Sequence, residues 1–247
     1  MKPVHFYLLL FYLLPFHAGA QRIHTEYYTE DRQKATPHSY AIRRDILQSD
    51  SGYVINDYNK KGKRRFSGQY ASIDTMIEHG GFKFYDKQGF IEAEGTYTHG
   101  EMTGTWIFYN DDKSIRRKIN YDFEKVDCAL SDMSELTEML ETPDSNRTEL
   151  LPVFMDGKPE TFYRFLYKQL EFPPLPKMTF VTGRIIVTFY IDTEGNVCNV
   201  STDGSANKDL EKESRRVISL SPQWQPGKLG DQPVKVIFSC PITFKFE

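Results

Sequence analysis

The chain of 247 residues is poor in the residues that mark metal and redox sites. It contains only three cysteines, Cys128, Cys198 and Cys240, and none belongs to a Cys-x-x-Cys pair. No cluster of histidines accompanies them, so we expect neither a metal site nor another cofactor. We also expect no disulfide between Cys198 and Cys240, because a strand should run between them.

The sequence also lacks a large excess of positive or negative charge, and it lacks the common catalytic motifs. The net charge is -3, so no basic field points to nucleic acid as a partner. The sequence has no nucleophile elbow, no His-Glu-x-x-His, no P-loop and no Gly-x-Gly-x-x-Gly. The carboxylates fall mostly in predicted turns. These absences predict a protein that is not an enzyme, while 18 Phe and 15 Tyr are typical of a folded chain.

The only long apolar run lies in residues 1–20, which have the pattern of a secretory signal peptide. Lys2 is followed by an apolar core, and Ala18-Gly19-Ala20 forms a small-residue cleavage site. The apolar run of about 12 residues spans roughly 18 Å as a helix, against about 30 Å of bilayer core. We therefore expect export and cleavage after Ala20. An uncleaved leader that anchors the chain in the inner membrane is the alternative.

Residues 52–123 contain an internal repeat. The motif Gly-x-Phe-x-Phe-Tyr at 80–85 returns 24 residues later, at 104–109, as Gly-x-Trp-x-Phe-Tyr. Each unit predicts a hairpin: an aromatic strand, a polar turn such as 86–89 or 110–113, and a strand that ends near Gly-x-Tyr. A single hairpin cannot bury its aromatic face, whereas stacked hairpins can. The repeat thus predicts an all-β meander with the aromatic residues as its core.

This pattern resembles the MORN-like repeats of bacterial antitoxin-type proteins. The segments on either side carry less information. Residues 21–51 are polar, and we interpret them as a short lead-in. Residues 124–150 form an acidic linker, in which four apolar residues at helical spacing predict a short amphipathic helix: Leu130, Met133, Leu136 and Leu140.

The C-terminal region, 151–247, predicts the order helix, strand, strand, helix, strand. The first helix should begin near Pro159 and the second should be capped by Asn207. The final run alternates apolar and polar residues, which places one set on a single face of a strand: Val234, Val236, Phe238, Cys240, Ile242, Phe244 and Phe246. Pro241 cannot donate a ladder hydrogen bond, which favours an edge strand or a bulge. An edge strand presents backbone groups that can pair with a partner peptide.

The residues of this region resemble the C-terminal domain of TonB-type energy transducers. The resemblance rests on motifs in matching order and spacing: Phe172-Pro173, Gly183-Arg-Ile-Ile-Val-x-Phe-x-Ile-Asp192, Gly195-x-Val197, Trp224-x-Pro-Gly227 and the final strand. It implies an α+β fold in which a three-stranded antiparallel sheet carries helices on one face.

The family's activity implies the function that we expect of this chain. Its members capture an extended peptide of an outer-membrane TonB-dependent transporter and work with inner-membrane motor proteins in energy-coupled transmembrane transport in the periplasm. The matching positions give the partner-binding residues: Phe172, Pro173, Val234, Lys235, Val236, Ile237, Phe238, Ser239 and Cys240. We expect Trp224 to hold its loop against the sheet rather than to contact the partner.

The chain also departs from a full transducer. The repeats and the acidic linker stand where a transducer has a long Pro-rich spanner, and the leader looks cleavable. The alternative function is a periplasmic scaffold in which the repeats bind the partner and the C-terminal domain only caps or dimerises. The sequence leaves open the transporter, its cargo and whether the chain forms a homodimer.

Overall fold

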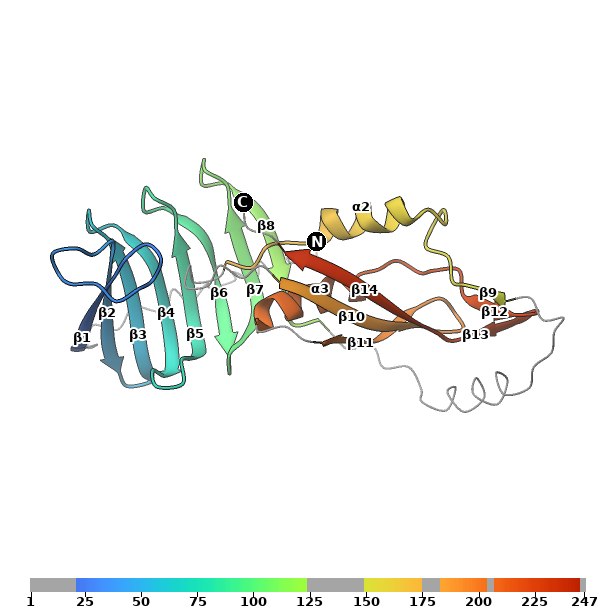
Figure 1. The fold of residues 1–247 in the computed structure, drawn as a ribbon, viewed down its shortest axis with the longest axis horizontal. Coiled ribbons are helices and arrows are strands. Elements are labelled where there is room, and N and C mark those ends of the chain that lie inside the picture. Colours follow the sequence, from blue (N-terminus) through green and yellow to red (C-terminus); the bar gives the residue numbers. More distant parts are fainter. Residues whose placement is uncertain (1–20, 124–148, 175–182, 204–206, 245–247) are drawn as a thin grey trace, which may run out of the picture.

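The structure, a computed structural model, describes residues 21–123, 149–174, 183–203 and 207–244. Two parts follow one another along the long axis, an N-terminal sheet and a smaller C-terminal α+β domain (Figure 1). The predicted signal peptide, residues 1–20, and nearly all of the acidic linker with its predicted helix lie outside the described residues. Within the described part of the chain, no helix is both long and apolar enough to cross a bilayer.

The N-terminal part is a single antiparallel meander in which each strand pairs with the next along the chain. Its strands are β1 (Gln21–Tyr28), β2 (Ile42–Ser49), β3 (Gly52–Asn59), β4 (Arg64–Ser72), β5 (Ile77–Tyr85), β6 (Ile91–Thr98), β7 (Glu101–Tyr109) and β8 (Ile115–Asn120). The predicted hairpins 77–98 and 101–120 are present. The sheet starts earlier than predicted, because the supposed lead-in 21–51 forms β1 and β2.

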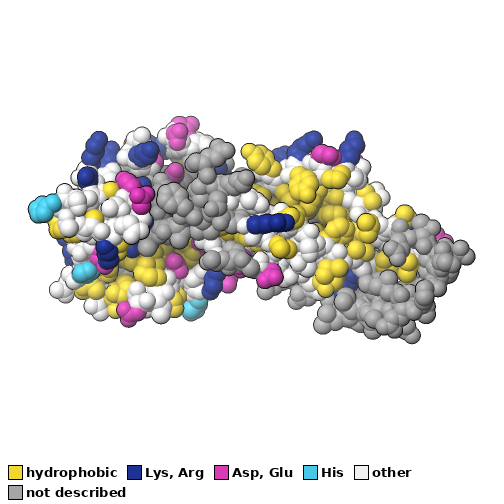
Figure 2. Space-filling view, in the orientation of Figure 1, with side chains coloured by type: hydrophobic (Ala, Val, Ile, Leu, Met, Phe, Trp, Pro, Cys, Tyr) yellow, Lys and Arg dark blue, Asp and Glu magenta, His cyan; other side chains and the backbone are white. Residues whose placement is uncertain are grey.

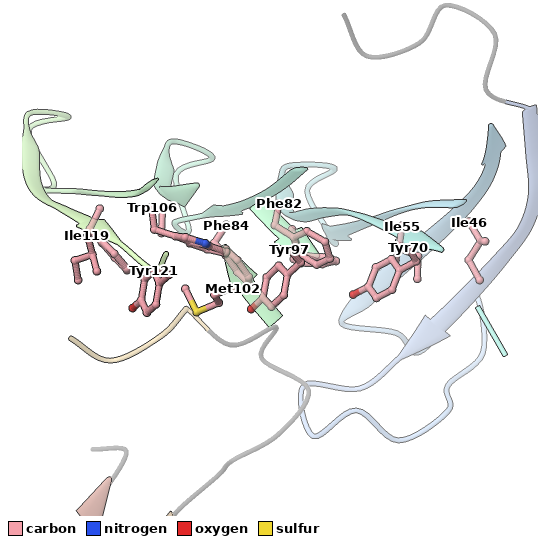
Figure 3. Packing of buried hydrophobic residues seen from close by; sticks show 13 residues of the cluster. Ile46, Ile55, Tyr70, Phe82, Phe84, Tyr97, Met102, Trp106, Ile119 and Tyr121 are labelled. Atoms are coloured by element: carbon pink, nitrogen blue, oxygen red, sulfur yellow. The ribbon is translucent and has the colours of Figure 1, made fainter. Parts of the chain in front are cut away.

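The aromatic residues of the repeat form the core of the meander, as predicted (Figure 3). Trp106 is fully buried, and Phe82 and Phe108 are nearly so. The glycines of Gly-x-Tyr make room for these rings. A Cβ atom on Gly95 would lie 2.1 Å from the indole of Trp106, and one on Gly68 would lie 2.6 Å from the ring of Phe82. Each unit's glycine therefore receives the aromatic ring of the following unit.

The first strands carry a buried ion pair that their sequence pattern did not reveal. Arg44 of β2 and Asp57 of β3 are both buried, and two hydrogen bonds of 2.8 and 2.9 Å join them. Arg32, from the loop between β1 and β2, donates to the same carboxylate at 2.8 Å. These two guanidinium groups hold the pKa of Asp57 below its usual value, although burial opposes them. The charges break the apolar alternation of β2, which explains why the sequence did not predict this strand.

The C-terminal part has the predicted order of elements. These are α2 (Pro159–Gln169), β10 (Gly183–Ile191), β11 (Val197–Asp203), α3 (Lys208–Ser219) and β14 (Val236–Phe244). Helix α2 has Pro159 in its first turn, and Asn207 caps α3 by accepting a hydrogen bond from Leu210 N at 3.0 Å. Three short strands form a separate sheet: β9 (Glu149–Leu150), β12 (Gly227–Leu229) and β13 (Gln232–Val234).

The main sheet has the order β11-β10-β14, and both helices contribute to its core. Leu166 of α2 and Val217 of α3 pack with Ile185 and Phe189 of β10. Because β10 separates β11 from β14, Cys198 and Cys240 lie on different outer strands. Cys240 is a free thiol, whereas Cys198 is disulfide-bonded, which confirms that these two cysteines are not joined.

The meander and the C-terminal domain touch through side chains. Arg116 of β8 donates to the carboxylate of Glu171 at 2.6 Å, and Arg117 donates to the carbonyl of Lys168, near the end of α2, at 2.9 Å. Strand β7 lies against α3. The contacts of the meander are therefore with the helices and the segment that follows α2.

Candidate functional site

Strand β14 is the edge strand of its sheet. It pairs with β10 along its whole length, from Val236 opposite Ile191 to Phe244 opposite Gly183. On its other side no strand among the described residues pairs with it. The predicted edge position of Pro241 in its sheet is therefore present.

The direction of the backbone groups of β14 follows from a hydrogen bond on the neighbouring strand. The carbonyl of Thr188 in β10 accepts a hydrogen bond of 3.3 Å from the side-chain hydroxyl of Ser201, its opposite residue in β11, so the backbone of Thr188 faces β11. Thr188 lies directly opposite Ser239 of β14. In an antiparallel pair, opposite residues exchange either both backbone bonds or neither. The N–H and C=O of Ser239 therefore face away from β10, toward the open side.

Pro241 lies two residues after Ser239, so its backbone groups point to the same side of β14. Its presence supports the outward direction of the Ser239 backbone groups. Proline is tolerated in an edge strand where its missing N–H would have pointed away from the neighbour. Ile237 and Thr243 have the same phase. The open side of β14, which we call the rim, therefore offers the N–H groups of Ile237, Ser239 and Thr243, together with carbonyls that include that of Pro241.

The side chains of β14 alternate as predicted. Cys240, Ile242 and Phe244 are buried in the core, whereas 56% of the surface of Ile237 is exposed on the opposite face. On that outer face the hydroxyls of Ser239 and Thr188 lie 3.2 Å apart. The strand has one apolar and one accessible face, so a strand added at the rim would itself need alternating side chains.

A cavity of about 290 Å³ lies beside the rim. Its lining comes from the start of α2 and the segment before it, from residues 238–241 of β14, and from Phe189 and Trp224. Six of the fourteen residues that line it are aromatic: Phe154, Phe162, Tyr163, Phe189, Trp224 and Phe238. Apolar side chains also gather on the visible surface of this domain (Figure 2). The cavity is suited to an apolar side chain of a guest strand.

The cavity has few charged side chains. Among the residues that line it, Lys158 alone carries a charge at neutral pH. Burial raises the pKa of the Cys240 thiol to about 11, so the thiol is neutral at pH 7. Trp224 is nearly buried, its ring centroid lies 5.4 Å from that of Phe238, and its indole N–H donates to Ser221 at 2.8 Å. Trp224 thus holds its loop against the sheet, and it also lines the cavity.

Two of the predicted partner-binding residues, Phe172 and Pro173, lie in the segment that follows α2. Pro173 is buried, and Phe172 packs on Phe244 with ring centroids 5.6 Å apart. Both line a second cavity, of about 220 Å³, against the meander residues Phe84 and Phe108. These two residues therefore lie beside the chain's own repeats.

The start of the last strand also differs from the prediction. Val234 ends the short strand β13, and β14 begins at Val236. Lys235 is 3% exposed, and its ammonium lies 5.0 Å from the ring centroid of Tyr190. Of the predicted partner-binding residues, 236–240 therefore lie in β14, with Ile237 and Ser239 on the rim, and the rim extends to Thr243.

Sequence reasoning missed the part of the cavity lining that does not belong to β14. Eight residues between Pro152 and Tyr163 contribute to it, and they come before the motifs that carried the resemblance. The helical spacing of Phe162, Phe165 and Leu166 predicted an inward face but could not show that part of it would border a cavity. Among the described residues no group of three or more His, Cys, Asp or Glu side chains could hold a metal ion.

Comparison with known proteins gives one family match. Residues 168–246 match the family described as Gram-negative bacterial TonB protein C-terminal. The match begins in the last two residues of α2 and includes β10, β11, α3 and β14, so it covers the rim and leaves out the meander and most of α2. Searches of curated proteins and of solved structures find no match to the chain. The resemblance of the meander to MORN-like repeats stays a prediction.

Proposed function

We propose that the chain is an exported binding protein that captures an extended peptide by adding it as a strand to the rim of β14. The unpaired rim, with the N–H groups of Ile237, Ser239 and Thr243 directed outward, is the observation that carries the proposal. The TonB C-terminal match at residues 168–246 supports a role in transport energy coupling. The proposed partner is a peptide segment of an outer-membrane TonB-dependent transporter, met in the periplasm.

Strand addition accounts for recognition of peptides with little sequence in common. Each backbone hydrogen bond contributes about 0.5–1.5 kcal/mol net, whatever the side chains of the guest. The cavity adds a preference at one position, because burying a large apolar side chain is worth about 1.5–3 kcal/mol. Guest side chains that share a face with Phe238 and Cys240 would enter it. We therefore expect a guest with a bulky apolar residue there and free choice at its immediate neighbours.

The proposal concerns binding and assigns no catalytic reaction. Among the described residues, the meander contacts α2, α3 and the segment around Glu171. A scaffold function in which the repeats bind the partner is less well supported, because the aromatic residues of the repeat are buried as a core.

A calorimetric titration with short synthetic peptides tests the proposal. We expect a peptide of alternating apolar and polar residues to bind, and the same peptide with prolines at its polar positions to lose binding because it cannot complete the ladder. Replacing the central apolar residue by alanine should weaken binding about tenfold or more, in line with the loss of about 1.5–3 kcal/mol.

The neighbouring position of the same peptide is the matched control. An alanine there points to the outer face and should leave the affinity within about twofold. Equal losses at both positions would contradict the cavity's role. Binding that survives the prolines, or that shifts amide resonances of the meander instead of β14, would overturn strand addition in favour of the scaffold function.

A further inference from the structure

Two tyrosines of the meander reach across to helix α3. The hydroxyl of Tyr97, in β6, donates to Asp209 Oδ2 at 2.6 Å, and the hydroxyl of Tyr121 donates to Glu213 Oε2 at 3.0 Å. The two tyrosines hold equivalent positions in successive repeats, and their rings lie on the same side of the sheet (Figure 3). All four groups are buried. The two parts of the molecule thus share a buried polar contact.

The two acids differ in how well their charge is compensated. Both oxygens of Glu213 accept hydrogen bonds of 2.7 Å from Arg216, and one also accepts the backbone N–H of Glu171 at 2.7 Å. Asp209 has the hydroxyl of Tyr97 on Oδ2, whereas its buried Oδ1 has no hydrogen-bond partner among the described residues. A buried carboxylate with half of its hydrogen-bonding capacity unused is costly to keep charged.

The neighbouring charges do not compensate Asp209 fully. Glu78 of β5 and Glu101 of β7 face it from the meander, and Lys212 faces it from α3. Lys212 also pairs with Glu101 at 3.3 Å, and Lys208 acts on Glu78. Burial, joined by the two acids, raises the pKa of Asp209 from 3.8 to about 7, although Tyr97 and Lys212 act the other way.

The hydroxyl of Tyr97, which donates to Asp209, does not titrate in the pH range in which Asp209 does. Burial raises the pKa of the Tyr97 hydroxyl well above its ordinary value. The negative charge of Asp209 is the next largest cause, and Glu78 and Tyr70 act in the same direction. Tyr97 therefore remains a donor at acidic and neutral pH, and Asp209 is the group whose charge changes. The first turn of α3 favours the charged form of Asp209, but burial outweighs this effect.

We propose that the Tyr97–Asp209 contact is a proton-dependent latch, which holds the meander on α3 when Asp209 is protonated and loosens when it is charged. The closed arrangement binds a proton that the separated parts, with an exposed Asp209, release. Stability that comes from a raised carboxyl pKa is complete at low pH and is lost as the pH rises. Because α3 also packs on β10 and β11, the latch sets how firmly the repeats are fixed to the peptide-binding domain.

The pH window follows from the two pKa values. Between about 4 and about 7 the equilibrium constant for docking should fall by up to tenfold per pH unit, and it should stay constant above about 7. The total change is at most on the order of a thousandfold. This inference does not depend on strand addition, because none of its groups lies on the rim.

A carboxyl-carbon NMR titration of the full chain tests the latch directly. The Cγ resonance of Asp209 should titrate with a midpoint near 7, and a midpoint near 4 would overturn the proposal. Hydrogen exchange of amides in β6 and α3, corrected for the intrinsic effect of pH, should speed up from about pH 5.5 to about pH 7 by about tenfold or more.

Two variants separate the latch from a general effect of pH. Asp209→Asn keeps an acceptor for Tyr97 but cannot titrate, so its corrected exchange should not change over this range. Glu211→Gln alters a neighbouring acid of α3 that pairs with Arg215 instead, and it should keep the full pH dependence. A dependence that persists in Asp209→Asn, or that disappears in Glu211→Gln, would contradict the latch. Should Asp209→Asn not fold, the titration of the unaltered chain decides alone.

Discussion

Replacing Ser239 by proline is expected to reduce binding of an extended peptide by at least about tenfold while the domain stays folded. The substitution removes an N–H that faces the open side of β14, and the proline ring obstructs the incoming strand. The fold should tolerate the change, because Pro241 occupies the same phase of the same strand. Each lost backbone bond accounts for about 0.5–1.5 kcal/mol, or about 2- to 13-fold in affinity, before the obstruction is added.

Two further variants isolate the backbone from the side chain. Ser239→Ala keeps the N–H and loses only the contact with Thr188, so its affinity should stay within about twofold of the unaltered chain. Pro241→Ala adds a missing donor to the rim and should tighten binding by up to about 13-fold. The affinities are measured by calorimetry, with circular dichroism as the check on folding. If proline and alanine at position 239 behave alike, the rim is not the binding surface.

Replacing Gly95 by alanine is expected to lower the free energy of unfolding of the meander by about 1–3 kcal/mol. The added methyl group would lie 2.1 Å from the indole of Trp106, a rigid ring with no exposed surface. The ring can make room only by shifting its neighbours in a packed core. Urea unfolding followed by tryptophan fluorescence measures the loss, because Trp106 reports on the same core.

Gly81 is the matched control for this substitution. It lies in the neighbouring strand β5, and the nearest atom to an added Cβ is the side-chain oxygen of Gln69 at 3.7 Å, an ordinary contact. Gly81→Ala should be neutral or stabilise by up to about 1 kcal/mol, because alanine restricts the unfolded chain. Equal effects of the two substitutions would show that the ring of Trp106 does not depend on the glycine beneath it.

Features with a local physical cause could be predicted from the sequence. The alternation in β14, the hairpins of the repeat, the start of α2 at Pro159 and the Asn207 cap all follow from spacing or from single residues. The edge position of β14 followed from Pro241, since a proline in a central strand would lose a ladder bond. This part of the site was therefore predictable without knowledge of the rest of the fold.

Features that depend on distant contacts could not be predicted. Strand β2 buries Arg44, which is stable only because Asp57 on the next strand compensates its charge. Lys235 was predicted to be a partner-binding residue, yet it is buried beside Tyr190. Phe172 and Pro173 match the family's motif, but in this chain they line a cavity together with residues of the repeats. In each case the partner lies in another strand or another part of the molecule.

Amide hydrogen exchange along β14, measured with and without a bound peptide, tests the central claim most directly. In the free protein the amides of Ile237, Ser239 and Thr243 should exchange rapidly, while those of Phe238 and Cys240, bonded to β10, should be protected. Saturating peptide should slow the first group by at least about tenfold and leave the second unchanged. Protection of the first group already in the free protein, or no change on binding, would contradict capture of a guest strand at this rim.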